Sequence, residues 1–373
     1  MNLLNFKNFL SKYDLDDKKI LLAVSAGVDS MVMLDFARQV LNPKNLYILY
    51  INHNVRSDTK LDQDLIAKYC RLYNLNFFSE SINVPDRNFE ENARNIRLKL
   101  YSSYIDKFNL SGVFLGHHLD DSIETFFYNL FKGSFLKGLS GIKSYNSDFK
   151  IFRPMLNYSK YQILNYANEN KIPFNVDYTN LDDKYARNFI RLNLIPKISE
   201  RFLGFKNNLK QKIKLFNELD NFLCKYVQNW MSENVIQKEY GSLVFKDSLY
   251  ELEDFLLFKV FDNLDIKCKS YNEFLDLKNK INSTGNLICK NNKFIYFSSD
   301  HILVSELDLK ALNLFYFNSI NVPNLKLLSE VNNIKNNNKS LFKTKRFKRI
   351  PFYFRSGAGV DLNGNVHTSD SVL

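Results

Sequence analysis

The sequence ILLAVSAGVDSMVML, residues 20–34, sets the architecture of the first half of this chain. It opens with a short apolar run, passes through the small and polar residues 25–30, and continues with apolar residues at helical spacing. We predict a buried strand, a tight loop and a helix in direct succession. A loop at such a junction presents backbone N–H groups and the amino end of a helix, and both attract an anion.

The same alternation of an apolar run, a turn and a helical pattern recurs through the first two hundred residues. Candidate strands cover residues 19–24, 46–51, 76–81 and 112–116, and helices are expected to begin near Ser30, Asp62, Glu90 and Asp121. This order predicts a doubly wound α/β domain with a parallel sheet. Right-handed crossovers bring the carboxyl ends of parallel strands to one edge of the sheet, so functional loops are expected there.

Beyond Pro196 the pattern changes to a long helical period, with Leu215, Leu219, Leu223 and Val227 spaced by four residues. Short β-rich runs follow at residues 294–297, 301–304 and 314–317, and the last 17 or so residues show no clear period. We therefore expect three domains, a doubly wound parallel-sheet domain over 1–200, a helical domain over 201–284, and a small α+β domain with a tail over 285–373.

Charge suggests a polyanionic partner. The chain has 373 residues, 45% of them hydrophobic, so it can bury a sizeable core. Its 51 Lys and Arg residues against 40 Asp and Glu residues give a formal net charge of +11. Such an excess favours a nucleic acid, because phosphates neutralised by the protein release counterions. A basic protein without such a partner is the alternative that composition leaves open.

Several classes of protein are not supported by the sequence. The four cysteines form no CxxC pair, so zinc ribbons and thiol redox motifs are disfavoured. The first residues lack the pattern of a signal peptide, and no run approaches the ~20 apolar residues of a membrane span. We therefore expect a cytoplasmic protein with no membrane partner. A homodimer is one candidate for the oligomeric state, which the sequence leaves open.

The residues of the 25–30 loop suit a nucleotide phosphate. Gly27 allows close approach of the backbone, and the Ser25 and Ser30 hydroxyls can donate hydrogen bonds to phosphate oxygens. Asp29 repels phosphate unless a divalent cation bridges the two, so Mg²⁺ is implied, held by Asp29 through ATP. The lysine of a Walker A loop is absent. Taken alone, the segment also fits an ordinary capped connection between a strand and a helix.

SAGVDS at residues 25–30 resembles the SGGxDS signature of the PP-loop superfamily of N-type ATP pyrophosphatases, whose members split ATP between its α and β phosphates. Ala26 stands where the family's first glycine is usual, which restricts the backbone at that point. The resemblance implies ATP as cosubstrate. It places ATP contacts on Ser25, Ala26, Gly27, Val28, Asp29 and Ser30, and on Ile51 at the end of the second strand.

Further segments resemble the tRNA(Ile)-lysidine synthetase family, in the order that the family has them. They are YINHNVR at residues 50–56, EENARNIR at 90–97, HHLDDSIET at 117–125, KGS at 132–134, GLSG at 138–141, RPML at 153–156, DYTN at 177–180 and YARNFIR at 185–191. The sequence departs from the family pattern at Asn52, Lys132, Phe135 and Thr179, and Phe135 replaces a glycine. Coverage of the C-terminal half is far weaker.

This resemblance implies a ligase that attaches L-lysine to the wobble cytidine of a CAU anticodon in tRNA(Ile). The cytosine oxygen is first adenylated by ATP with release of pyrophosphate. The lysine amine then displaces AMP, and codon reading changes from AUG to AUA. The C-terminal parts, over 201–284 and 285–373, are then expected to bind tRNA. From its residues alone, the basic run at 343–349 could follow a phosphate backbone or form an ordinary solvated basic face.

The resemblance also assigns roles to individual residues. Catalysis is expected from Asp29, His117, Asp121, Arg94 and Arg97, lysine binding from Asp121, Glu124 and Thr125, and tRNA binding from Arg187, Asn188 and Arg191. His53 and Arg56 are expected at the edge of the pocket.

Plainer readings exist for each group. Arg94 and Arg97 could pair with Glu90 or Glu91, the His-Asp-Glu group could cap a helix, and the residues near 187–191 could serve packing.

Three other functions remain as rivals. A tRNA thiolation enzyme of the same superfamily would ordinarily need paired cysteines. An amidotransferase-type synthase would need a glutaminase domain or partner. A catalytically inactive RNA-binding module would have no use for the carboxylates at Asp29, Asp121 and Glu124.

Overall fold

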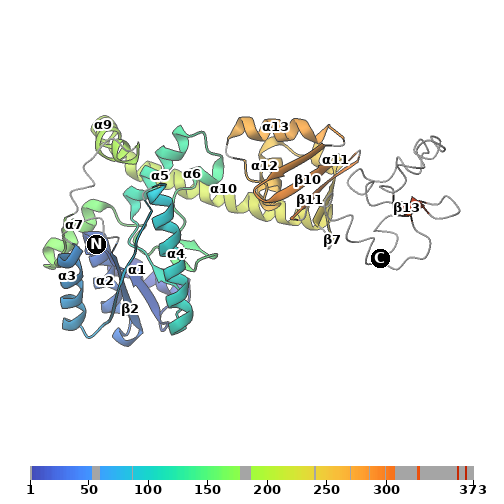
Figure 1. The fold of residues 1–373 in the computed structure, drawn as a ribbon. Helices are drawn as coiled ribbons and strands as arrows, with labels where there is room; N and C mark the ends of the chain where they lie inside the picture. The colour runs from blue at the N-terminus through green and yellow to red at the C-terminus, as the bar shows by residue number, and fades with distance from the viewer. Residues whose placement is uncertain are drawn as a thin grey trace. The chain divides into compact units, whose positions relative to one another are not determined.

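The computed structural model describes residues 2–52, 59–85, 87–176, 186–238, 241–268, 270–284, 286–298 and 300–306, with the short strands at 326–327, 359–360 and 366–367. The chain forms two compact units, Met1–Glu218 and Leu219–Leu373 (Figure 1). His53, Arg56, the segment 177–185, the expected strand at 314–317 and the basic run at 343–349 lie outside the described residues.

The N-terminal unit is built on a six-stranded sheet with the order β3-β2-β1-β4-β6-β5. Its strands are β1 (Ile20–Ala23), β2 (Leu46–Asn52), β3 (Asn76–Ser81), β4 (Val113–Phe114), β5 (Tyr145–Asn146) and β6 (Ile151–Phe152). All neighbours are parallel except β5, which is antiparallel to β6. The predicted doubly wound α/β class is confirmed, and the change of direction in strand order lies between β1 and β4.

Helices connect these strands and continue beyond them. They are α1 (Leu3–Lys12), α2 (Val28–Val40), η1 (Pro43–Asn45), α3 (Thr59–Leu72), α4 (Phe89–Phe108), α5 (Leu119–Phe131), α6 (Leu136–Leu139), α7 (Lys160–Glu169), α8 (Ala186–Phe189), the π-helix η3 (Ile190–Leu194), α9 (Ile195–Arg201) and α10 (Phe205–Asn234), which enters the second unit at Leu219.

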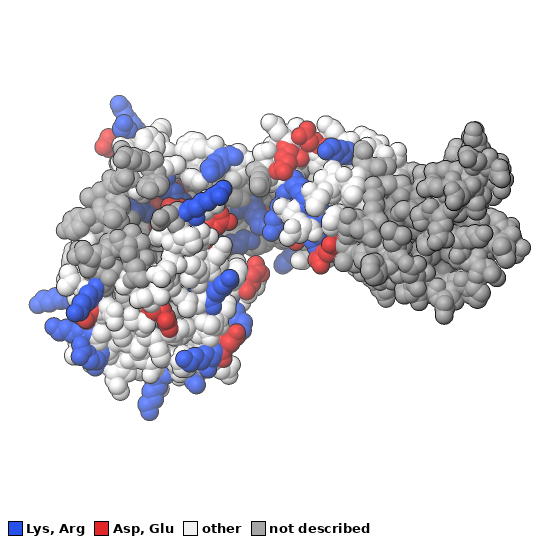
Figure 2. All heavy atoms as spheres, viewed as in Figure 1, with Lys and Arg blue, Asp and Glu red and all other residues white. Residues whose placement is uncertain are grey.

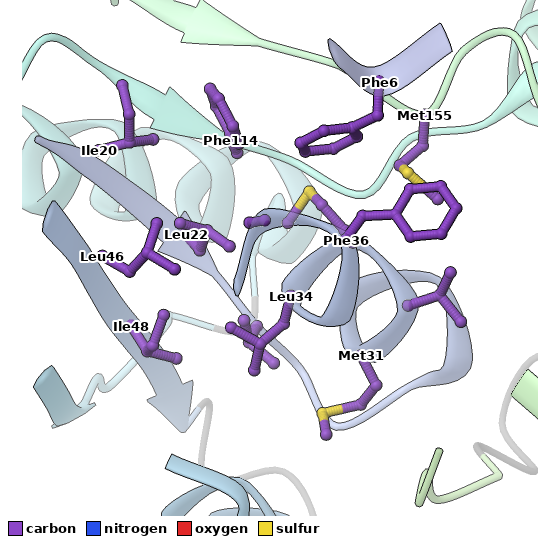
Figure 3. Packing of buried hydrophobic residues seen from close by; sticks show 14 of the residues in the cluster. Phe6, Ile20, Leu22, Met31, Leu34, Phe36, Leu46, Ile48, Phe114 and Met155 are labelled. Carbon is purple, nitrogen blue, oxygen red and sulfur yellow. The ribbon is translucent and has the colours of Figure 1, made fainter. Parts of the chain in front are cut away.

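The core of this unit follows from alternation along the central strands. In β1, Ile20 and Leu22 belong to the cluster that also holds Leu34 and Phe36 of α2, as Figure 3 shows. Leu21, between them, belongs instead to a cluster on the opposite face, which is packed by α4. Successive side chains of a strand point to opposite faces, so a continuous apolar run is what a sheet covered on both sides requires.

The second unit contains a five-stranded antiparallel sheet with the order β7-β8-β11-β10-β9. Its elements are β7 (Val235–Lys238), β8 (Gly241–Phe245), α11 (Lys246–Tyr250), α12 (Asp254–Asn263), α13 (Tyr271–Ile281), β9 (Asn286–Lys290), β10 (Lys293–Phe297) and β11 (His301–Ser305). Three short strands, β12 (Lys326–Leu327), β13 (Gly359–Val360) and β14 (Val366–His367), pair with one another.

The β7–β8 hairpin falls in a segment that the sequence led us to expect as helical. Its β-branched Val235, Ile236 and Val244 favour a strand, and pairing of β8 with β11 buries Val244 completely. The sheet therefore takes strands from both sides of the expected boundary at residue 284. The division into three domains remains a prediction. No helix in the described part of the chain is long and apolar enough to cross a membrane.

Candidate active site

The 25–30 loop is closed on itself by Ser30. The Ser30 hydroxyl donates to the Gly27 carbonyl oxygen at 2.9 Å, and the Ser25 N–H donates to the Ser30 hydroxyl at 3.1 Å. Gly27 occupies the N-cap of α2 and has no side chain to satisfy the first amides of the helix. These amides are free of side-chain caps, unlike those of α5 and α7, so they suit an anionic ligand.

Ala26 adopts a left-handed backbone conformation, with φ of 63°. It is fully buried, and its carbonyl oxygen accepts a hydrogen bond from the Asn175 N–H at 2.9 Å. The departure from the family's glycine therefore leaves a conformation in which a Cβ is disfavoured, at roughly 1–2 kcal/mol for an L-residue in this region. The surrounding structure holds the loop in this shape despite the methyl group.

A second loop, residues 115–118, lies against the first. It follows β4, which pairs with β1, so both loops leave the sheet at the same edge. Gly116 permits the contact, because a Cβ there would lie 3.2 Å from the Ser30 nitrogen. His118 Nε2 lies 3.5 Å from Asp29 Oδ1. The structure thus brings the two loops together at the topological switch point, where open α/β sheets bind ligands.

His118, the neighbour of the expected catalytic residue His117, faces Asp29. His118 is buried and forms a capping box with Asp121, whose Oδ2 accepts the His118 N–H at 2.9 Å. Helix capping is thus one of the roles of this group. Adjacent His117 has an enclosed Nδ1 with no hydrogen-bond partner among the described residues. Burial lowers the pKa of His117 to about 4, although the charge of Asp121 works to raise it.

The carboxylates of α5 are held by cations from later helices. Glu124 accepts two hydrogen bonds from Arg191, at 2.7 and 2.8 Å, and Arg191 Nη2 also lies 3.5 Å from Asp121 Oδ1. Burial is the main cause that raises the pKa of Glu124 above its ordinary value, although Arg191 works to lower it. Arg191, expected to contact tRNA, lies beside Asp121 and Glu124, the carboxylates expected to bind lysine. Asp120, not foreseen from the sequence, pairs with Lys206 Nζ at 2.6 Å.

Lys160 is the functional candidate that sequence reasoning missed most clearly. Its Nζ lies 2.8 and 2.7 Å from the two carboxylate oxygens of Asp29, and its N–H donates to Asp120 Oδ2 at 2.7 Å. Lys160 is the first residue of α7, directly after the capping-box residue Ser159. The capping pattern predicts the start of a helix there, but only the fold brings that helix to the 25–30 loop.

Arg94 and Arg97 lie on α4, and within the described part of the chain neither forms an ion pair with Glu90 or Glu91. The charge of Arg97 instead reaches His117 of the second loop, and that of Arg94 reaches Arg153, which follows β6. Burial first, and then the charge of Arg94, lower the pKa of Arg153, and the charge of Arg97 contributes to lowering the pKa of His117. Arg153 Nη1 donates to the Lys143 carbonyl oxygen at 2.8 Å, and its Nε is buried without a described partner.

The remaining expected residues are more dispersed. Ile51 packs on the α4 side of the sheet, and Thr125 is half-buried beside Glu124. Asn188 is half-buried on α8, and exposed Arg187 lies over the ring of Tyr128 with 5.3 Å between guanidinium carbon and ring centroid. The structure therefore brings Asp29, His118, Asp121 and Glu124 together. Arg187 of α8 lies beside Tyr128, four residues beyond Glu124 on α5.

Comparison with known proteins gives a consistent picture. The family model of the PP-loop domain matches residues 3–198. The tRNA(Ile)-lysidine synthase of Mycoplasma mycoides is 35% identical over 228 residues, covering 60% of this chain and 55% of that protein. The tRNA(Ile)-lysidine synthase of Borreliella burgdorferi is 30% identical over 306 residues, covering 77% of this chain and 67% of that protein.

A solved U34-tRNA thiolase from Methanococcus maripaludis is 16% identical, with a TM-score of 0.49, covering 58% of this chain and 76% of that one. The chain spans little more than half the length of the Mycoplasma relative.

Proposed function

The chain belongs to the PP-loop domain family and, within it, to the tRNA(Ile)-lysidine synthases, and we propose that it uses ATP to join L-lysine to the wobble cytidine of a CAU-anticodon tRNA(Ile). The observation that carries the proposal is the meeting of two loops at the switch point. His118 Nε2 lies 3.5 Å from Asp29 Oδ1, so the anion-binding loop and the carboxylates of α5 share one site.

In the first step, the cytosine oxygen attacks the α-phosphate of ATP and pyrophosphate leaves. Such a transfer depends mainly on positioning and charge stabilisation. The free amides of α2 and the Ser25 hydroxyl would hold the pyrophosphate, and Lys160 adds a positive charge 2.7 Å from Asp29. Arg94 and Arg97 are proposed to stabilise charge that develops on the phosphates.

Mg²⁺ fits this site only together with ATP. Among the described residues, no three His, Cys, Asp or Glu side chains converge to hold a metal ion. Mg²⁺ commonly binds through one or two carboxylates plus substrate phosphates, and Asp29 is the carboxylate placed for that role. When bound there, the ion would neutralise phosphate charge. Lys160 Nζ contacts the same carboxylate, so a positive charge beside Asp29 supports this part of the proposal.

In the second step, the lysine ε-amine attacks the activated carbon and AMP leaves. Asp121 and Glu124 are proposed to bind the amine, since Glu124 already accepts a long cationic side chain, that of Arg191. The amine must lose a proton before it attacks. Burial raises the pKa of Glu124, which makes its carboxylate a better proton acceptor than an exposed glutamate.

The tRNA must present a base that has left the anticodon stack. Arg187 and Asn188 are proposed to contact the tRNA, while Arg191 binds Glu124 and lies 3.5 Å from Asp121. Basic side chains are spread over the face of the N-terminal unit in Figure 2, so charge alone does not locate the path of the RNA.

Sulfur transfer to tRNA is less well supported. All four cysteines are unpaired as disulfides, and burial raises the pKa of Cys70 to about 12, so its thiol is a poor nucleophile. Among the described residues no metal-binding cluster is formed that could hold an iron–sulfur centre.

The test is incorporation of radiolabelled lysine into a CAU-anticodon tRNA(Ile) transcript, with Mg-ATP and with a transcript whose wobble cytidine is changed to uridine. Label that requires both ATP and the cytidine supports the proposal. Asp121→Asn should abolish labelling and leave tRNA binding intact, because the amide still accepts the capping hydrogen bond. Absence of label, with AMP and pyrophosphate still formed, would reject lysine as the second substrate and retain the ATP chemistry.

A further inference from the structure

Tyr128 of α5 carries two cations on its ring. Lys132 Nζ lies 4.5 Å from the ring centroid, and the guanidinium carbon of Arg187 lies 5.3 Å from it. Lys132 follows α5 as its C-cap, and Arg187 comes from α8, which packs against α5. Tyr128 is half-buried, whereas both cations are exposed. The Tyr128 ring thus makes cation–π contacts with two basic side chains, one after α5 and one on α8.

No acidic partner balances these charges in the part of the chain that the structure describes. The Tyr128 ring is the side-chain partner of both Lys132 and Arg187, and neither forms a salt bridge with a carboxylate of the described residues. Both cationic heads lie beside one aromatic ring, which attracts each of them but carries no net charge to balance theirs. A negatively charged group that reached both heads would supply that balance.

The position of the pair on α5 relates it to the proposed active site. Glu124, Tyr128 and Lys132 are spaced by four residues and therefore lie along one face of the helix. On the facing segment, Arg191 pairs with Glu124 and Arg187 pairs with Tyr128, again four residues apart. One turn of helix rises about 5.4 Å, so Tyr128, the ring that both cations contact, lies roughly one turn beyond Glu124, the carboxylate proposed to bind lysine.

We propose that Lys132, Tyr128 and Arg187 form a phosphate clamp for the backbone of an RNA loop whose reacting base lies over Glu124. This deepens the proposed function and rests on it for the identity of the base. The guanidinium of Arg187 can bind a phosphate through two hydrogen bonds, and Lys132 adds a point charge. Tyr128 positions both and need not touch the RNA.

The probes are two fluorescent RNA hairpins, an anticodon stem-loop with CAU and the same stem-loop with UAU. Binding to the full chain is followed by fluorescence anisotropy at several salt concentrations, without ATP or lysine. Lys132→Ala and Arg187→Ala should each weaken binding at least about fivefold. Each should also reduce the slope of log affinity against log salt by roughly 0.7–0.9. Both hairpins should lose affinity equally, because phosphate contacts carry no base information.

Variants of the ring test the positioning role. Tyr128→Leu should weaken RNA binding several-fold, because the cations lose their shared support, while Tyr128→Phe should retain it. Lys68→Ala, which removes an exposed lysine from α3, is the matched control and should bind like the wild type. Thermal unfolding of each variant separates a loss of folding from a loss of binding.

The outcomes separate the clamp from the proposed function. If the Lys132 and Arg187 variants lose thermal stability but bind both hairpins with wild-type affinity and salt slope, the stack serves packing and the clamp is wrong. If the variants lose RNA binding while the wild type fails to label the tRNA with lysine, the clamp stands and the lysine ligation is rejected.

Discussion

Arg191 binds Glu124 through two parallel hydrogen bonds, Nε to Oε1 at 2.7 Å and Nη2 to Oε2 at 2.8 Å. Glu124 is buried, and Arg191 comes from the π-helix η3, a helix type found often at functional sites. A lysine ammonium that approaches Glu124 must therefore share or replace this guanidinium. The pair links the proposed amine site to the segment that the sequence associated with tRNA.

Removal of Arg191 should lower the stability of the fold, because Glu124 loses its ion-pair partner. We expect Arg191→Met to lower the free energy of unfolding by about 1–3 kcal/mol, because a buried carboxylate is left unpaired beside Asp121. Adding Glu124→Gln to that variant should recover part of the loss. Urea denaturation of the wild type, both single variants and the double variant measures the coupling. Equal stability of Arg191→Met and the wild type would show that the pair is too solvated to matter.

Lys160 should matter for ATP and not for folding. The lysine is partly exposed, so its ion pair with Asp29 contributes little to stability. We expect Lys160→Met to raise the KM for ATP about tenfold, a loss of roughly 1.4 kcal/mol of binding, and Lys160→Arg to restore most of it. tRNA-dependent formation of AMP at varied ATP concentration measures this, with Lys68→Ala as control. An unchanged KM in Lys160→Met would remove Lys160 from the phosphate site.

Strand and turn patterns in the sequence predicted those parts of the site that lie in loops directly after strands. The strand at residues 76–81 has the predicted limits, and the pairing of β1 with β4 brings the 25–30 loop to the 115–118 loop. The capping box of α5 places His118, next to the expected His117, against Asp29, and a catalytic role for His117 stays a prediction. The sequence did contain that signal, an acidic residue three positions after His118.

Other contacts were beyond local reasoning. Lys160 lies 131 residues from Asp29, and Lys206 lies 86 residues from Asp120. No period or motif sets such pairs, because they depend on how α7 and α10 pack on the sheet. The β7–β8 hairpin was missed for a related reason, since β8 is stabilised by pairing with β11, some sixty residues further along the chain.

Ala26 offers a test of strain in the phosphate loop. Ala26→Gly relieves a left-handed conformation but loses a buried methyl group and makes the unfolded chain more flexible, so we expect stability to change by less than about 1 kcal/mol. Ala37→Gly, at a fully buried helical position of α2, should cost at least about 1 kcal/mol. Urea denaturation compares the two. An equal cost at both positions would show that the φ of Ala26 carries no strain.

His117 should make the chain sensitive to mild acid. Burial lowers the pKa of His117 to about 4, whereas an unfolded histidine titrates near 6.5. Above pH 6.5 the ring is neutral in both states, and its contribution to stability is fully present. As the pH falls from 6.5 towards 4, the unfolded state gains a proton that the folded state does not bind, so stability is lost.

His117→Asn removes this titration and keeps a neutral polar side chain. At pH 5 the wild type should have lost about 2 kcal/mol through His117 that the variant does not lose. The difference between unfolding free energies at pH 7.5 and pH 5, measured for both proteins by urea denaturation, isolates the effect because the other titrating groups are common to both. If the variant loses as much stability as the wild type, then His117 is protonated in the folded chain at pH 5. Burial of the ring, with the charges of Arg153 and Arg97 added to it, would then be too weak to keep His117 neutral.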